Sequence, residues 1–334
     1  MKTYIVTGCA GMIGWRVTEL LISNGANVLG IDDLNQAYDN RIKIWRLSEL
    51  KKHPGFEFYE SDITQLETLN SIFDKQSKAK SFDGLIHLAA RAGVRQSILD
   101  PRDYYSVNLN GTLNLLEACK DLNVAKFVLA STSSIYGDGT SSLSSDNRLS
   151  EDLRTDNPIS PYAASKKAAE VCAYTFHHLY GIDVSVLRYF TVYGPAGRPD
   201  MSLFRFVQKI YEGWPITVFG DGTQSRDFTY VDDIARGTVA SLKQLDFETI
   251  NLGSGIPIVL LDAIKIIEAV IGKKAIITNE PAHPTDVKET WADNSKAQEI
   301  LNWSPEVSFE NGIKELVDWY EKNQTWAREL NSVS

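Results

Sequence analysis

The sequence predicts an α/β protein, in which a Rossmann-type doubly wound parallel sheet is followed by a smaller α/β lobe. Apolar stretches that resemble strands alternate with helical patterns as far as Tyr189. Such alternation is typical of a parallel sheet with right-handed crossovers. After Tyr189 the turns become denser, and arginines gather at positions 198, 205 and 226. We therefore expect a first domain over residues 1–189, to which 231–254 return, and a second lobe over 190–334, with a ligand between them.

The individual elements follow from the spacing of the apolar residues. Strands are expected at 4–7, 27–31, 56–60, 84–90, 127–130 and 183–189. Helices are expected after the first glycine cluster, over 40–50 and 65–77, after Pro101, and over 160–180. A polar, serine-rich loop should span 138–157. His87 lies inside an apolar stretch, so we interpret it as a core residue and not as a catalyst.

Composition excludes several functional classes. A net charge of -9 argues against binding to nucleic acid or to an acidic membrane surface. Three widely separated cysteines predict neither a disulfide framework nor a metal site. The chain runs from Met1 straight into a strand, and no apolar run approaches the roughly 20 residues of a membrane helix. We therefore expect a cytoplasmic protein.

A glycine cluster at the end of the first strand predicts a dinucleotide site. Gly8, Gly11 and Gly14 precede a helix, and a second strand ends at Asp32. The glycines permit a pyrophosphate to approach the helix N-terminus, and the acid accepts the ribose hydroxyls of NAD and repels the extra phosphate of NADP. The ends of two later strands carry further candidates. We expect Asp62 and Ile63 to bind the adenine, and the small side chains of Ala89 and Ala90 to leave room for the cofactor.

Tyr162 and Lys166 are the residues around which we interpret the chemistry. They are four positions apart on a predicted helix that Pro161 helps to start, so both side chains share one face. A cation beside a phenol favours the phenolate and makes a tyrosine a usable base. A surface pair is the alternative. Hydroxyls from Ser131 to Ser134 follow a strand end where ligands are expected, although a serine-rich stretch is also typical of a simple turn.

These motifs together resemble a known family. Thr7 to Gly14, His87 to Ala90, Ser131 to Gly137, Tyr162 with Lys166, and Arg226 to Asp233 are similar to motifs of the extended short-chain dehydrogenase/reductases, specifically the NAD-dependent nucleotide-sugar epimerases. The segment Leu187 to Met201 is most similar to the UDP-glucuronate 4-epimerase branch.

The resemblance implies a catalytic trio. Tyr162 takes the proton from the sugar 4-hydroxyl, directly or through Thr132. Hydride passes to NAD and returns to the opposite face of a 4-keto sugar. Lys166 holds the nicotinamide ribose and lowers the pKa of Tyr162. The implied cofactor contacts are Gly8, Gly11, Met12, Ile13, Asp32, Asp62, Ile63, Leu88, Ala89, Ala90, Asn108, Tyr162, Lys166 and Tyr189.

The resemblance also implies a UDP-sugar substrate. Arg226 matches the arginine that binds the diphosphate, where a guanidinium suits phosphate. Thr191 and Arg198 are the candidates for a carboxylate at C6, although Arg198 is equally a turn arginine. The other implied contacts are Thr132, Met201, Phe204 and Asp286.

Three positions depart from related branches. Ser134 stands where dehydratases and decarboxylases usually have a glutamate, which favours simple epimerisation. His283 stands where many relatives have an arginine, and Thr290 is smaller than the residue usual in UDP-glucose epimerases. We therefore expect conversion of UDP-glucuronate to UDP-galacturonate. The alternatives are a 4-epimerase of UDP-glucose or UDP-N-acetylglucosamine and, more remotely, a UDP-glucuronate decarboxylase or a non-catalytic NAD sensor.

The resemblance finally implies a homodimer. In this family the helices near 101–120 and 160–180 pair across a two-fold axis. Their apolar contacts would come from Leu113, Leu116, Val171, Tyr174 and Leu179, unless these residues face the subunit's own sheet.

Overall fold

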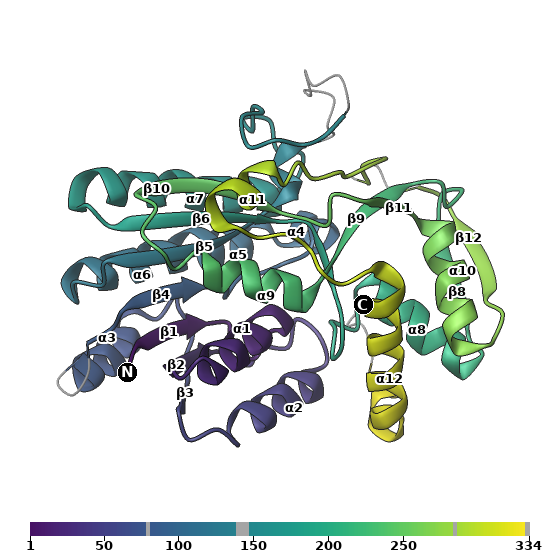
Figure 1. Cartoon of the computed structure of the whole chain (residues 1–334), viewed down its shortest axis with the longest axis horizontal. Coiled ribbons are helices and arrows are strands. Elements are labelled where there is room, and N and C mark those ends of the chain that lie inside the picture. The colour runs from purple at the N-terminus through teal and green to yellow at the C-terminus, as the bar shows by residue number, and fades with distance from the viewer. Residues whose placement is uncertain (78–80, 138–146, 283–285, 331–334) are drawn as a thin grey trace.

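A seven-stranded parallel sheet forms the centre of the protein (Figure 1). The computed structural model describes residues 1–77, 81–137, 147–282 and 286–330, so most of the predicted serine-rich loop lies outside the described residues. The strand order is β10-β6-β5-β4-β1-β2-β3. The order reverses between β1 and β4, and ligands bind at such a reversal in doubly wound sheets. These strands are β1 (Thr3–Thr7), β2 (Asn27–Asp32), β3 (Phe56–Glu60), β4 (Gly84–His87), β5 (Lys126–Thr132), β6 (Asp183–Tyr189) and β10 (Phe247–Leu252).

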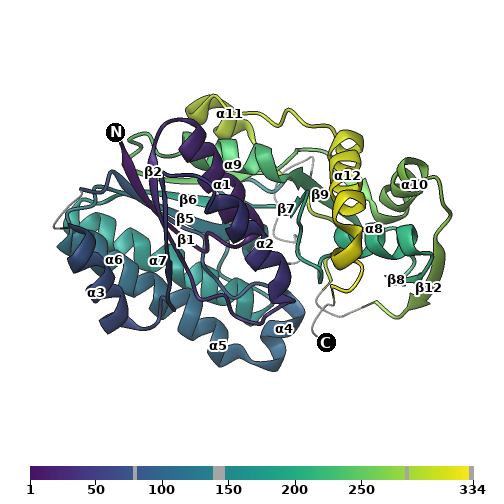
Figure 2. The same cartoon turned by 90° about the horizontal axis from the view of Figure 1, so that it is seen from below.

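The sheet is buried on both faces, which explains why its strands are continuously apolar. In β1, Tyr4 and Val6 pack on one side, and Ile5 packs on the other. Figure 2 shows the two layers of helices. One layer contains α1 (Met12–Ser23), α9 (Val231–Ala240) and α11 (Ser295–Leu301), and the other contains α3 (Leu66–Ser77), α6 (Gly111–Asp121) and α7 (Pro161–Tyr180).

A second lobe follows the sixth strand, as the change in composition predicted. It has a three-stranded sheet in the order β11-β9-β7 and a two-stranded parallel sheet of β8 and β12. Its helices and the helix α2 of the first lobe share one hydrophobic core. The elements are β7 (Thr191–Tyr193), α8 (Ser202–Glu212), β8 (Pro215–Phe219), β9 (Ser225–Tyr230), β11 (Pro257–Val259), α10 (Leu260–Ile271), β12 (Ile276–Glu280), α12 (Phe309–Ala327) and α2 (Asn40–Leu50).

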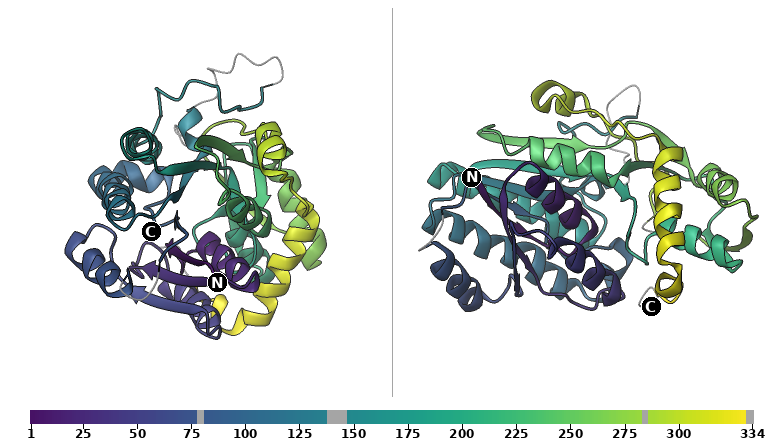
Figure 3. Two further views of the ribbon diagram at one scale, coloured as in Figure 1. Left: turned by 60° about the vertical axis from the view of Figure 1, so that its left-hand side comes forward. Right: turned by 60° about the horizontal axis from the view of Figure 1, so that its bottom comes forward.

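The two lobes are joined by aromatic packing. Helix α12 lies beside α2 on one side and α8 on the other (Figure 3). Trp45 of α2 meets Trp319 and Trp326 of α12 with ring centroids 5.4 and 6.4 Å apart, and Trp15 of α1 meets Trp45 at 5.4 Å. This continuous core holds the sheet edge and the second lobe in one arrangement.

Two predicted elements end differently from expectation. The strand predicted over 84–90 stops at His87, because β4 pairs with β1 only as far as Thr7 and with β5 only as far as Leu129. The long helix expected after Pro101 is divided into α5 (Pro101–Tyr105), a π-helical turn (Ser106–Asn110) and α6. A π-helical turn inserts one residue into a helix and often marks a functional site. Two shorter helices complete this region, α4 (Val94–Leu99) and a 3₁₀ turn (Ser133–Tyr136).

His87 is a core residue, as predicted. It is fully buried, with Nδ1 2.8 Å from Thr7 Oγ1 and Nε2 3.0 Å from Thr112 Oγ1. Burial holds its pKa well below the usual value. In the described part of the chain, no helix is both long enough and apolar enough to cross a membrane.

Candidate active site

The glycine cluster forms a turn between β1 and α1 that leaves the helix N-terminus open. Gly8 has φ +73°, a backbone conformation that residues other than glycine rarely adopt. A Cβ on Gly8 would lie 2.6 Å from Ala89 N, so the backbone just after β4 also requires a glycine here. Gly11 caps α1 without a side-chain hydrogen bond. The first N–H groups of α1 are therefore available to an anion.

Asp32 lies at the end of β2, beside this turn. Its Oδ2 accepts from Ala10 N at 3.0 Å, and its Oδ1 accepts from Leu34 N at 2.9 Å. Burial raises the pKa of Asp32, while the nearby charge of Lys43 opposes the rise. The carboxylate is thus held rigidly at the edge of the cavity into which α1 points.

The first cavity is a cleft that opens to solvent, and its empty space, including the solvent at its mouth, is about 1140 Å³. It extends from the Asp32 end across the open end of α1 to α7. With the exception of Asn108, every residue that the sequence predicted for the cofactor lines it: Gly8, Gly11, Met12, Ile13, Asp32, Asp62, Ile63, Leu88, Ala89, Ala90, Tyr162, Lys166 and Tyr189. A glycine cradle, an uncapped helix end and a ribose-accepting carboxylate fit NAD.

Helix α7 begins just where its sequence indicated. Ser160 accepts a hydrogen bond from Ala163 N at 3.1 Å, and Pro161 occupies the first turn. Tyr162 and Lys166 then lie one helical turn apart and both face the first cavity. Tyr162 also lines a second, adjoining cavity, as do Ser131 and Arg198. The phenol therefore lies where the two cavities meet.

The predicted lowering of the pKa of Tyr162 by Lys166 stays a prediction, because the shift of this pKa has other causes here. Burial raises the pKa of Tyr162, and a hydrogen bond with Thr132 and the charge of Arg198 oppose the rise. Lys166 is itself deeply buried, and burial lowers its pKa to about 8, opposed by the charge of Glu170. A lysine whose own charge is disfavoured is a weaker source of phenolate stabilisation than the sequence suggested.

The second cavity carries hydroxyls on one wall and arginines on another. Thr132 Oγ1 donates to Ser134 Oγ at 3.2 Å and accepts from Ser134 N at 3.1 Å, which fixes the turn after β5. Of the predicted substrate residues, all but Phe204 line it: Thr132, Thr191, Arg198, Met201, Arg226 and Asp286. Phe204 packs in the core of the second lobe, beside a small neighbouring pocket that Thr191, Arg198 and Met201 also line.

The two arginines of this cavity differ in how they are held. Arg198 is paired with Asp200 through Nε at 3.0 Å and Nη2 at 2.6 Å. Arg226 donates Nη1 to the carbonyls of Ser225 and Lys288, and it forms no ion pair with any residue that the structure describes. Burial lowers the pKa of Arg226. Arg226 is therefore the stronger candidate for a ligand anion, since the carboxylate whose charge acts on it, Asp286, is paired with Arg95.

Asp286 lies at the far end of the second cavity, where it binds an arginine that the sequence did not indicate. Arg95 of α4 pairs with Asp286 at 2.6 Å, and its guanidinium stacks 4.1 Å from the ring centroid of Phe219. The neighbouring His283, which departs from the family pattern, lies outside the described residues.

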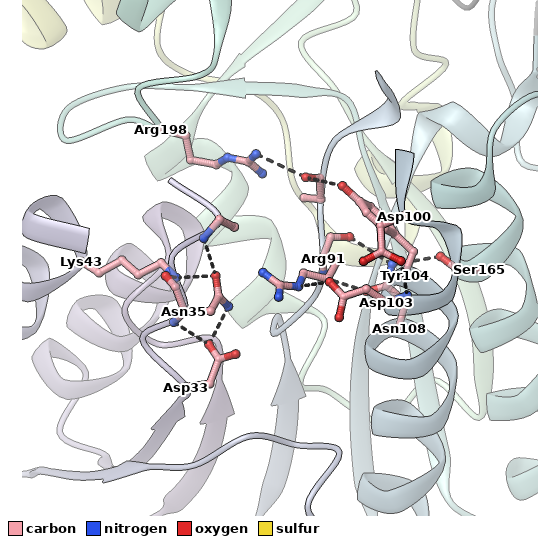
Figure 4. A network of polar contacts seen from close by, with 12 residues as sticks. Asp33, Asn35, Lys43, Arg91, Asp100, Asp103, Tyr104, Asn108, Ser165 and Arg198 are labelled. Carbon is pink, nitrogen blue, oxygen red and sulfur yellow. Dashed lines mark hydrogen bonds and ion pairs between the residues drawn. The ribbon is translucent and has the colours of Figure 1, made fainter. Parts of the chain in front are cut away.

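Asn108 is buried and does not line the first cavity, and its contact with the cofactor stays a prediction. Its Oδ1 accepts from Arg91 N at 2.8 Å, and its Nδ2 donates to Arg91 O at 3.0 Å and to Ser165 Oγ at 2.9 Å (Figure 4). The π-helical turn that carries Asn108 thus clamps the segment after β4 against α7.

Sequence reasoning missed the rim of the first cavity that α2 provides. Lys43 lines it and donates Nζ to Asn35 O at 2.6 Å, and Figure 4 shows Arg91 across from this pair. Arg46, fully buried, binds Ala10 O at 2.9 Å and so anchors the glycine turn. The sequence did carry a signal for this rim. Lys43 and Arg46 fall on the same face of the helix as Ile42 and Leu50, and that face of α2 is buried.

The fold and the joined cavities define a class, namely a dinucleotide-dependent enzyme of the short-chain dehydrogenase/reductase type. The chain belongs to the NAD dependent epimerase/dehydratase family, whose model matches residues 4–253. NAD is accordingly the cofactor, as predicted.

Three known proteins are similar to this chain over almost its whole length. The chain is 57% identical to a UDP-glucuronate 4-epimerase of Thermodesulfobacterium geofontis over 97% of each chain. It is 38% identical to the UDP-glucuronic acid 4-epimerase of Bacillus cereus, solved with UDP-glucuronic acid and NAD, with a TM-score of 0.87 and coverage of 96% and 99%. It is 31% identical to the UDP-glucose 4-epimerase of Thermotoga maritima, solved with UDP-glucose, with a TM-score of 0.86 and the same coverage.

Proposed function

We propose that the protein interconverts UDP-glucuronate and UDP-galacturonate by NAD-dependent epimerisation at C4. The observation that carries this proposal is the position of Tyr162, at the junction between the dinucleotide cavity and a cavity lined by hydroxyls and arginines. The relatives support the choice of sugar. The TM-scores to the two kinds of epimerase are nearly equal, but the identity is higher to the two enzymes of UDP-glucuronate.

The chain's own residues perform the proton transfer and the orientation. The residues that line the first cavity would hold NAD, which would supply reversible hydride transfer at C4 of the sugar. Tyr162 removes the proton of the 4-hydroxyl and later restores it, and Thr132 lies within hydrogen-bonding reach of its phenol. Lys166 holds the ribose beside the sheet end. Because burial disfavours the charges of both groups, the site must exclude water to make their mutual interaction strong.

The second cavity suits the rest of the substrate. Arg226 binds the diphosphate, since its cation has no carboxylate partner among the described residues. Thr191 and Arg198 bind the C6 carboxylate. Because Asp200 already compensates the charge of Arg198, this arginine acts there mainly as an oriented donor. Ser134 places a hydroxyl where elimination or decarboxylation would need a carboxylate.

The test is to incubate the protein separately with UDP-glucuronate, UDP-glucose and UDP-N-acetylglucosamine, and to separate the products by anion exchange. We expect conversion of UDP-glucuronate to UDP-galacturonate. Conversion of the neutral sugars alone would contradict the carboxylate assignment. No conversion of any sugar by NAD-loaded protein would instead support a sensor.

Replacing Arg198 tests the carboxylate assignment directly. In Arg198→Met, we expect kcat/KM for UDP-glucuronate to fall by about 10- to 100-fold, the value of one charge-assisted hydrogen bond. Any neutral UDP-sugar that the enzyme accepts should lose much less. The matched control is Arg205→Met, on α8, because Arg205 lines neither cavity. Equal losses for charged and neutral sugars would mean that Arg198 only supports the cavity wall.

A homodimer through α7 is also part of the proposal. Val171, Tyr174 and Leu179 are 56%, 53% and 61% exposed and lie on this helix. Leu116 is fully buried against the subunit's own sheet, which is the alternative that the sequence left open for it. Residues 1–189 with 231–254, and 190–334, remain the proposed domains, and a cytoplasmic location remains a prediction from the sequence.

The dimer predicts a specific change in sedimentation. The wild type should sediment as a dimer, and Val171→Glu/Tyr174→Glu should sediment as a monomer, because like charges in an apolar interface are left unpaired. Ile276→Arg is the control, since Ile276 is similarly exposed but lies on β12 in the second lobe. A monomeric wild type would contradict the proposal.

A further inference from the structure

A buried ion pair lies directly beneath the proposed catalytic residues. Glu170 of α7 is one helical turn beyond Lys166 and two beyond Tyr162. Its Oε1 accepts from Arg188 Nε at 3.1 Å, and its Oε2 accepts from Arg188 Nη2 at 3.0 Å. Both side chains are only 5% exposed. The mechanism described so far uses neither of them.

The pair holds the strand end that carries the catalytic hydroxyl. Ser131 Oγ donates to Glu170 Oε1 at 2.6 Å, and Ser131 is opposite Arg188 in the register of β5 and β6. Ser131 lines both cavities and immediately precedes Thr132. A movement of Glu170 would therefore displace the backbone from which Thr132 approaches Tyr162.

The network continues under the hydroxyl wall of the second cavity. Arg188 Nη1 donates to Tyr136 Oη at 3.0 Å, and Tyr136 Oη donates to Asn251 Oδ1 at 2.7 Å. Tyr136 ends the 3₁₀ turn that carries Ser133 and Ser134. One connected set of buried contacts thus supports α7, β5, β6 and this turn.

The titratable groups around Lys166 and Glu170 lie on α7, β4 and β6. Glu170 is on the same helix face, Tyr162 is one turn before it, and His87 of β4 is buried and uncharged. Glu170 in turn faces Arg188 of β6 and Lys167, whose Nζ is 3.5 Å from Oε2. The carboxylate of Glu170 opposes the effect of burial on the pKa of Lys166.

Stability alone is a poor reason for this arrangement. Removing two charges from water costs several kcal/mol per ion, and buried pairs are often replaceable by apolar residues without loss of stability. The Glu170–Arg188 pair lies next to the proposed catalytic residues, and Glu170 is hydrogen-bonded to the strand end that carries Thr132. This position gives the pair a use besides stability.

We propose that Glu170 and Arg188 are positioning residues for the catalytic centre, where Glu170 fixes the Ser131–Thr132 strand end and places a carboxylate one helical turn from Lys166 on the same face of α7. Arg188 holds Glu170 in the orientation that serves both contacts. This inference rests on the proposed roles of Tyr162 and Lys166, and it adds residues that touch neither cofactor nor sugar.

The experiment uses Glu170→Gln and the double variant Glu170→Gln/Arg188→Met. Glutamine keeps an acceptor for Ser131 but removes the charge, so the pKa of Lys166 falls. Activity is lost as pH rises through that pKa, and the alkaline limb of kcat/KM should therefore move to lower pH by about 1 unit or more. The double variant lacks the guanidinium that Glu170→Gln leaves unpaired, so it should regain thermal stability. The alkaline limb of its kcat/KM profile should stay at the lower pH.

A matched control exists between the same two strands. Lys126 of β5 and Asp183 of β6 form another buried pair at the opposite end of the strands, five residues from Ser131 and Arg188, or roughly 17 Å at 3.3 Å per residue. Lys126→Met/Asp183→Asn should lower the melting temperature and leave the pH profile unchanged.

Two results would overturn the inference. One is an unshifted alkaline limb in both Glu170 variants. The other is a limb that returns to the wild-type position in the double variant, since the shift would then come from the unpaired arginine. If the single variant does not fold, the double variant decides alone. NAD affinity, measured by calorimetry against pH, gives the same comparison without turnover, so failure of the epimerase assay in the wild type remains a separate outcome.

Discussion

Tyr162→Phe is expected to abolish nearly all epimerisation while leaving NAD bound. The phenol is the group that exchanges the proton of the sugar hydroxyl, and loss of a general acid–base typically costs about 10²- to 10⁴-fold in rate. The ring itself remains, so the cavity wall and the start of α7 should be unchanged. The measurement is single-turnover conversion of UDP-glucuronate by variant protein whose NAD content is determined separately.

Tyr104→Phe is the matched control for this prediction. Tyr104 packs edge-on against Tyr162 with ring centroids 6.2 Å apart, and its hydroxyl donates to Ala92 O at 3.3 Å. Its removal deletes one neutral hydrogen bond beside the same site. We expect a loss of about tenfold or less. Similar losses in the two variants would mean that Tyr162 acts by packing and not by proton transfer.

Gly8→Ala is expected to have the second largest effect, on cofactor binding. A Cβ at this position would lie 2.6 Å from Ala89 N and 2.7 Å from Leu88 C, both backbone atoms that must move. Displacing the turn removes the open end of α1 from the pyrophosphate. One or two charge-assisted hydrogen bonds at about 1.5–3 kcal/mol each correspond to a loss of NAD affinity of about 100-fold, measurable by calorimetry.

Gly25→Ala is the control that measures backbone strain without the collision that a Cβ on Gly8 makes with the backbone of Leu88 and Ala89. Gly25 follows the same helix and also has a positive φ, +81°, but a Cβ there would meet nothing within 4 Å. The substitution should cost about 1–2 kcal/mol of stability, from the left-handed conformation alone, and should not alter NAD affinity. If Gly8→Ala binds NAD as tightly as Gly25→Ala does, the turn does not cradle the pyrophosphate.

The amino-acid sequence by itself determined the features that depend on local patterns. Continuous apolar strands between helical segments predicted the parallel sheet, because strands covered on both faces have no polar side. Gly8, Gly11 and Asp32 predicted the dinucleotide cavity, since a phosphate at a helix end and a ribose at a strand end require particular residues at particular spacings. The four-residue spacing of Tyr162 and Lys166 is likewise a property of one helix.

Only the tertiary structure decided which charges are compensated. Nothing in the spacing shows that Arg198 is already paired with Asp200, that Arg226 is held by carbonyls, or that Asn108 clamps Arg91. Glu170 and Arg188 are 18 positions apart and meet only because α7 packs on β6. The pKa of Tyr162 follows the same logic: burial raises it, and Thr132 and Arg198, which lie on other elements, oppose the rise.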